Sequence, residues 1–164
     1  MLAALLLAIG TVAPAPDRFL SVNVWLAATL PAAAGPRLGI QLGPFEAYGG
    51  FDPISLSAVL DDQVTGYTYP LVLGGRAHLR LPIGFERGDI FAGIEFSGWR
   101  ETIRRQYDET FRRATGVVGL RWGWGVGLFE LAAGMTRWDE TRQFSNYAVR
   151  SWMPALEMGI GLSF

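Results

Sequence analysis

Residues that could carry out nucleophilic or acid–base chemistry are few in this sequence. His78 is the only histidine, so any mechanism that needs an imidazole must use it. The candidate nucleophiles are Ser55, Ser57, Ser145 and Ser151, and a serine needs a base within reach to be activated. The sequence also contains no cysteine and no HExxH, GxSxG, P-loop or EF-hand pattern. We therefore expect no enzyme, no metal site and no cofactor.

Charged residues form a more informative set, because they recur at every second position beside apolar neighbours. In the segment around His78, for example, Arg76, His78 and Arg80 alternate with Ala77 and Leu79. Such alternation is typical of a strand with one polar and one apolar face. The complete set on the polar faces of the expected strands is Arg76, His78, Arg80, Glu95, Arg121, Glu130 and Glu157.

The segments that must position these residues alternate with a period of two along most of the chain. Half of the 164 residues are hydrophobic, yet no stretch has the length and purity of a membrane-spanning helix. Turn residues and charge clusters separate the alternating segments. We predict eight strands, at residues 20–30, 38–42, 45–60, 67–81, 90–97, 117–124, 129–136 and 155–164. Eight is an even number, and it suffices for a small closed barrel without free sheet edges.

Alternation alone does not distinguish a membrane barrel from a soluble lipocalin-like barrel, in which the apolar face points inward. The composition of the second face favours the membrane barrel, because that face is rich in glycine and carries all the charges of the strand centres. Glycine gives little solubility but leaves room inside a narrow barrel. We expect Arg76, Arg80 and Arg121 to pair with Glu95, Glu130 and Glu157 in the lumen, since an isolated buried charge is costly.

Aromatic residues collect near the expected strand ends, which indicates two membrane-interface girdles. One girdle comprises Trp122, Trp124, Phe129 and Phe164, and the other comprises Tyr67, Tyr69 and Trp152. The longest expected loop, 100–113, is strongly charged. Its arginines, which are Arg100, Arg104, Arg105, Arg112 and Arg113, would either contact anionic lipid head groups or simply be solvated.

The amino-terminal segment has the pattern of an export signal. Met1 to Val12 is a short apolar stretch, followed by the small-residue sequence Ala13-Pro14-Ala15. We predict a signal peptide over residues 1–15 and one barrel domain over residues 16–164. A first strand or a buried helix is the alternative interpretation of the apolar stretch. The formal net charge is −1, and no basic run with interleaved aromatics occurs, so we expect no nucleic-acid partner.

The chain over about residues 19–164, with its terminal sequence MGIGLSF, resembles the small eight-stranded bacterial outer-membrane barrels, the family of the OmpA-like transmembrane domain. The resemblance implies an all-β, closed, antiparallel up-and-down transmembrane barrel in the outer membrane, in contact with its lipids. It also implies that the barrel-assembly machinery reads the last strand and Phe164 during insertion. Unlike in two-domain members of that family, we expect no peptidoglycan-binding domain after the barrel, and the oligomeric state stays open.

Four functions are compatible with this sequence. A paired, filled lumen favours a structural or surface-interaction barrel. A small pore or gated channel along the inner charges is the first alternative. Some barrels of this kind modify lipid A, so a membrane enzyme is the second alternative, although none of the four candidate serines is expected on the same surface as His78. A soluble ligand-binding barrel is the third.

Overall fold

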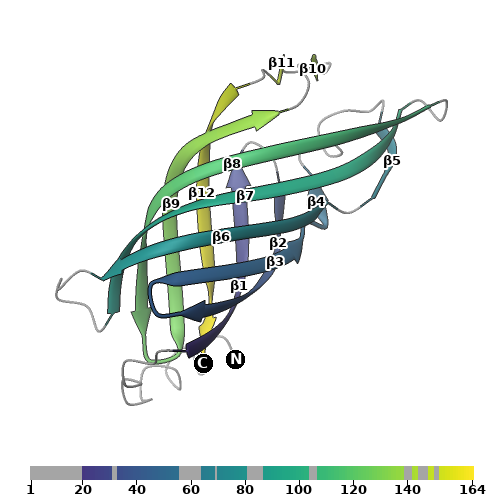
Figure 1. The fold of residues 1–164 in the computed structure, drawn as a ribbon. Coiled ribbons are helices and arrows are strands. Elements are labelled where there is room, and N and C mark those ends of the chain that lie inside the picture. Colours follow the sequence, from purple (N-terminus) through teal and green to yellow (C-terminus); the bar gives the residue numbers. More distant parts are fainter. Residues whose placement is uncertain are drawn as a thin grey trace, which may run out of the picture.

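The computed structural model is an all-β barrel (Figure 1). It describes residues 20–30, 33–55, 64–68, 70–80, 87–103, 107–138, 142–143, 148–149 and 152–164. No helix in this part of the chain is long and apolar enough to cross a membrane. The strands are β1 (Leu20–Leu30), β2 (Ala33–Leu42), β3 (Phe45–Phe51), β4 (Ile54–Ser55), β5 (Val64–Tyr67), β6 (Leu71–Arg80), β7 (Arg87–Ile103), β8 (Tyr107–Trp124), β9 (Gly127–Trp138), β10 (Arg142–Gln143), β11 (Ala148–Val149) and β12 (Trp152–Ser163).

Ten of these strands form one closed antiparallel sheet. β3 and β4 pair one after the other with β2, and β6 and β5 pair one after the other with β7. The ten strands therefore occupy eight strand positions around the barrel, and we call each position a stave. The barrel closes because β1 pairs with β2 on one side and with β12 on the other. The predicted all-β, closed, eight-stranded antiparallel barrel is thus confirmed. β10 and β11 form a separate pair.

Two tight turns define one end of the barrel. Gly43, between β2 and β3, has a φ of 56°, and Gly125, between β8 and β9, has a φ of 55°. Side chains with a Cβ rarely adopt this left-handed conformation, so glycine permits both hairpins. Figure 1 shows the start of β1 and the end of β12 at the end that holds the β8–β9 turn. We call this the terminus end and the opposite end the loop end.

Alternation along each strand separates an apolar outer face from an inner face. On β1, Leu26 and Leu30 are exposed while Trp25 and Thr29 are buried. The outward residues predicted from the sequence are placed accordingly: Ile94, Leu120, Leu131 and Ile160 are among the exposed large hydrophobic residues, and Trp122 is partly exposed. The inner face therefore supplies the packed interior, which is mixed rather than purely apolar.

Prolines divide two of the predicted strands. β3 ends just before Asp52-Pro53, and the predicted strand 45–60 resumes only as β4; residues 56–60 lie outside the described residues. Pro70 likewise separates β5 from β6. A proline has no N–H to give to the ladder, which explains a break at each position. Both breaks leave the line of the stave intact.

Two regions between the predicted strands contain strands: residues 31–37, expected as a turn, and the expected loop 100–113. β2 begins at Ala33, because the ladder with β1 continues through Gly35 and Pro36 to Arg37. The predicted charged loop 100–113 is wrong: β7 runs to Ile103 and β8 begins at Tyr107, and their ladder includes Gly98 opposite Arg112. Figure 1 shows this hairpin reaching past the neighbouring staves at the loop end. Residues 104–106 and the predicted signal peptide, 1–15, lie outside the described residues.

Gly74 tests whether the inner face needs glycine. Its position opposite Tyr48 places the phenol ring where a Cβ would stand, so Gly74→Ala forces that ring to move. Overpacking of this kind destabilises by about 1–3 kcal/mol. The matched control is Gly116→Ala, because nothing lies within 4 Å of a Cβ there. Denaturant unfolding in detergent micelles compares the two variants. Equal unfolding free energies for both would contradict the proposed interior crowding.

Candidate functional site

The inner face holds two clusters of buried ion pairs. We call the first the Arg76 cluster; it consists of Arg76, Arg121, Glu46, Glu130 and Glu157, with His78 beside it. We call the second the Arg37 cluster; it consists of Arg37, Arg113, Asp52 and Glu95. Every one of these side chains is buried, so the ion pairs lie away from water.

Arg76, on β6, forms the centre of the first cluster. Its Nη1 lies 2.8 Å from an oxygen of Glu130, and its Nη2 donates to Glu157. Three aromatic rings surround the same guanidinium, with the centroids of Trp25, Tyr48 and Phe91 at 5.2, 4.7 and 4.6 Å from its Cζ atom. Contacts over ring faces favour a cation that has lost its water. Acids and aromatic rings together therefore replace the hydration of Arg76.

Arg121, on β8, extends this cluster toward the terminus end. Its Nη2 lies 2.6 Å from Glu46 and also pairs with Glu130. The second Glu46 oxygen accepts a 2.6 Å hydrogen bond from Asn23 Nδ2. His78 Nε2 lies 3.2 Å from Glu46 as well. The Glu46 carboxylate thus has three polar partners, which are Arg121, Asn23 and His78, and a buried carboxylate needs such partners.

The Arg37 cluster lies beyond the Arg76 cluster, toward the loop end. Arg37 Nη1 lies 2.7 Å from Asp52 Oδ1, and Arg113 Nη2 donates to Glu95 at 2.8 Å. Tyr48 donates its hydroxyl to Glu95 at 3.4 Å, so this residue touches both clusters. Two acids and two bases make this cluster neutral. At the same end, the buried rings of Trp99 and Trp138 meet edge to face, with centroids 5.5 Å apart.

The structure unites most of the lumen residues predicted from the sequence, with different pairings for some. Arg76 and Arg121 meet Glu130, and Arg76 also meets Glu157. Glu95 instead pairs with Arg37 and Arg113, neither of which the sequence analysis placed inside. Arg80 is exposed at the end of β6 and does not lie within the clusters.

Four lumen residues were missed or misplaced, and each has a local reason. Arg113 belongs to β8, where it stands opposite Ser97, so its assignment to an outer loop is wrong. Arg37 shares a face with Gly39, but Pro36 marked it as part of a turn. Glu46 and Asp52 share a face with Tyr48 in a segment too irregular to assign by period. Extending the alternation of each strand outward would have identified all four.

The remaining predicted residues have the following positions. Arg100 and Arg112 are exposed on β7 and β8, and Arg104 and Arg105 lie outside the described residues. Trp122 stacks on Phe129 with centroids 5.6 Å apart, and Trp124 and Phe164 are exposed at the same end. Trp152 lies at the opposite end of β12, with the Arg137 guanidinium over its ring. Tyr67 lies in β5, and Tyr69 is outside the described residues.

The candidate nucleophiles do not form a catalytic site in the described residues. Ser55 ends β4, while Ser57, Ser145 and Ser151 lie outside the residues that the structure describes. Within the described part of the chain, no group of three or more metal-ligating side chains is close enough to hold a metal ion. The described polar side chains of the lumen form ion pairs and hydrogen bonds with one another.

Glu130 offers a direct test of the Arg76 cluster, because it pairs with both arginines and is fully buried. Glu130→Gln removes the shared negative charge and leaves two guanidiniums with fewer partners. Breaking a buried ion pair from one side costs about 3–5 kcal/mol, so we expect an unfolding free energy lower by that amount. Arg100→Gln, at an exposed position, is the control and changes stability by less than about 0.5 kcal/mol. If Glu130→Gln were as stable as the control, the cluster would not stabilise the barrel.

Comparison with known proteins agrees with this architecture. No protein-family model and no curated protein sequence matches the chain. Among solved structures, it is similar to the crystal structure of the N-terminal β-barrel domain of Pseudomonas aeruginosa OprF, with a TM-score of 0.51 and 14% sequence identity. The match covers 88% of this chain and 96% of the OprF domain. The chain thus has the closed β-barrel fold of the OprF N-terminal domain.

Proposed function

We propose that this protein is an integral barrel of the bacterial outer membrane, with a structural or surface-interaction role and a largely occluded lumen. The observation that carries the proposal is the inverted distribution of side chains: large apolar residues surround the outside, while the ion pairs lie within. The fold shared with the OprF domain supports the same assignment.

The outer face is unsuited to water. Leu71, Leu73 and Leu79 are 71%, 69% and 67% exposed on β6 alone, and similar residues continue around β1, β2, β9 and β12. Soluble monomers rarely expose apolar patches of more than a few hundred Å². A bilayer covers such a belt without cost. Strands of 10 to 12 residues, as in β1, β2, β6, β9 and β12, also match the length of about 9–11 residues that a tilted strand needs to span it.

The barrel ends have the chemistry of membrane interfaces. At the terminus end, the stacked Trp122 and Phe129 lie beside exposed Trp124. At the loop end, the guanidinium of Arg137 lies over the ring of Trp152. Aromatic residues prefer the head-group region, which supports a girdle at each end. The exposed Arg100 lies on the extended β7–β8 hairpin, where it is suited to contact anionic head groups.

The filled interior supports a structural role over a diffusion pore. Bulky side chains of both clusters meet across the lumen, and the rings of Trp25, Tyr48 and Phe91 pack against Arg76 between them. An interior of eight strands is just wide enough for side chains to fill it. The proposed function therefore lies in the outer surface and the loops, with outer-membrane lipids as the immediate partners and the barrel-assembly machinery as a transient one.

Membrane fractionation with gel migration tests the location. We expect the protein in the outer-membrane fraction, and we expect the unboiled sample to migrate differently from the boiled one, because the closed sheet resists detergent until it is heated. The Gly74→Ala variant has a less stable interior. We therefore expect it to lose this difference in gel migration after heating to a lower temperature than the unmodified protein needs. Recovery of the folded protein in the aqueous fraction would contradict the proposal and favour a soluble barrel.

Phe164 tests the assembly step. Its backbone N–H donates to Val22 at 2.9 Å and its carbonyl accepts from Val22 at 3.0 Å, so Phe164→Ser keeps both closing hydrogen bonds. Its side chain is 51% exposed, and burial of a phenylalanine contributes at most about 3 kcal/mol. We expect this variant to reduce insertion in cells much more than it reduces the stability of refolded barrel.

Phe45→Ser is the matched control for the Phe164 variant, because Phe45 is an outward phenylalanine, 66% exposed, at the same end of the barrel. It should insert at nearly the normal level. The two yields are compared by quantifying folded barrel in isolated outer membranes. Normal insertion of Phe164→Ser would contradict a targeting role for the terminal residue.

A further inference from the structure

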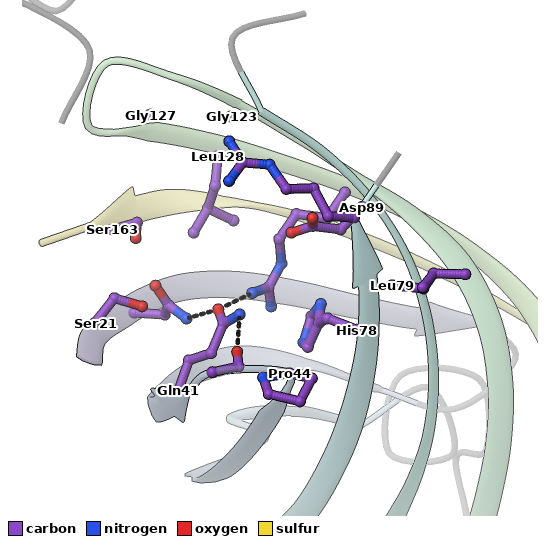
Figure 2. Close-up of a pocket in the computed structure, with 14 residues that line it drawn as sticks. Ser21, Gln41, Pro44, His78, Leu79, Asp89, Gly123, Gly127, Leu128 and Ser163 are labelled. Carbon is purple, nitrogen blue, oxygen red and sulfur yellow. Dashed lines mark hydrogen bonds between the residues drawn. The ribbon is translucent and has the colours of Figure 1, made fainter. Parts of the chain in front are cut away.

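The terminus end of the barrel contains a cavity of about 430 Å³ above the Arg76 cluster. Its wall comes from many staves and is mixed, with apolar residues such as Pro44, Leu79 and Leu128 beside polar ones. Figure 2 shows His78 and Asp89 on one side of the cavity, with Ser21 and Ser163 across from them. Gln41 lies at its base, where it accepts hydrogen bonds from Asn23 and Arg121 and donates to the Gly43 carbonyl. Both the oxygen and the nitrogen of the Gln41 amide therefore have partners within the protein.

Two buried atoms on this wall have no partner. Asn23, 1% exposed, donates through Nδ2 to Glu46, but its Oδ1 is unsatisfied. His78, 8% exposed, faces Glu46 through Nε2, and its Nδ1 is unsatisfied. An ionised carboxylate only accepts, so in a neutral imidazole the hydrogen lies on Nε2, facing Glu46, and Nδ1 is an acceptor. Both unmatched atoms are acceptors, and they call for a ligand that donates.

Asp89 adds a third acceptor. It lies on β7 opposite Arg80, which makes it the diagonal neighbour of His78 on β6. Diagonal neighbours in a sheet have Cα atoms roughly 7–8 Å apart, which allows one small group to contact both side chains. Asp89 is half-exposed, and its side chain forms no hydrogen bond or ion pair with another described residue. Its carboxylate is thus available to the cavity.

The charges of the Arg76 cluster, which lies next to the cavity, favour binding of a cation. Glu46, Glu130 and Glu157 supply three carboxylates to the Arg76 cluster, and Arg76 and Arg121 supply only two guanidiniums. At the rim, the charges of Arg80 and Asp89 balance. A buried surplus of one negative charge is costly unless a cation approaches. The cavity therefore combines unmatched acceptors with a local excess of negative charge.

We infer that this cavity is a binding site for a small primary ammonium ion. The N–H groups of the ligand are donated to His78 Nδ1, Asn23 Oδ1 and the Asp89 carboxylate. A short hydroxylated chain on the ligand meets the hydroxyls of Ser21 and Ser163 on the far wall. The positive charge of the ligand offsets the excess of carboxylates in the Arg76 cluster. This site is independent of the apolar outer face and of the proposed outer-membrane role.

Because the chain has a single histidine, the ¹⁵N resonances of its imidazole report on this cavity alone. The probe is protonated 2-aminoethanol, titrated into the refolded barrel in micelles at about pH 8, where alkylamines remain charged. We expect a saturable shift of the His78 Nδ1 resonance and a rise in Tm with ligand concentration. Tetramethylammonium has the same charge without N–H groups and should produce neither effect.

Asp89→Asn keeps the shape of the side chain and removes its charge, so we expect the affinity for 2-aminoethanol to fall about tenfold or more. Ser97→Ala, in the lumen away from the cavity, is the control and should bind normally. If Asp89→Asn does not fold, the comparison of the two cations on the unmodified protein decides alone. Absence of a saturable shift, or equal shifts with both cations, overturns the inference; the first result would mean that a proton supplies the missing charge.

Discussion

The packing of the barrel interior depends on the contacts of one group, the guanidinium of Arg76. It reaches from β6 to carboxylates on β9 and β12, and it lies against rings from β1, β3 and β7. One side chain thereby ties six of the eight staves together across the lumen. Removing a cation from water is expensive, and only the combination of acids and ring faces at short range offsets that cost. The same geometry fills the lumen around Arg76 with side chains.

The size of the barrel follows from this contact. Rings and ion pairs can cross an interior of eight staves only where the opposing inner positions are small. Gly93 lies against the stem of Arg76, and Gly39 and Gly159 both lie against the ring of Trp25. A larger residue at any of the three would occupy space already filled. The large inward side chains thus require glycine at the opposing inner positions. The alternate positions of each strand point outward, and these carry the apolar residues.

The sequence predicted the faces better than the partners. Alternation assigned Arg76, His78, Arg121, Glu130 and Glu157 to the lumen, because a period of two depends only on the local chain. Partners across the lumen depend on the tilt and stagger of the staves, which no single strand encodes, so the pairing of Glu95 was beyond reach.

The errors at strand ends have a related cause. Gly35 and Pro36 resemble a turn, and the charges of 100–113 resemble a solvated loop, yet both segments continue ladders that their neighbours begin. Composition describes whether a segment tolerates water. It does not say whether a neighbouring strand is present to pair with it. Arg113 shows the consequence, since its place inside the lumen follows only once β8 is known to start before it.

The seam of the barrel lies between the first and last strands, and this has a consequence for how the chain folds. The β1–β12 ladder joins Asn23 to Ser163 and Leu30 to Leu156, so residues from opposite ends of the chain must meet. Such non-local pairing is kinetically slow, because loop-closure entropy is lost before any contact compensates for it. Until β12 has been synthesised, β1 has an open edge able to pair with other chains. The nascent protein therefore depends on being kept unfolded, and apart from its neighbours, until β12 is made.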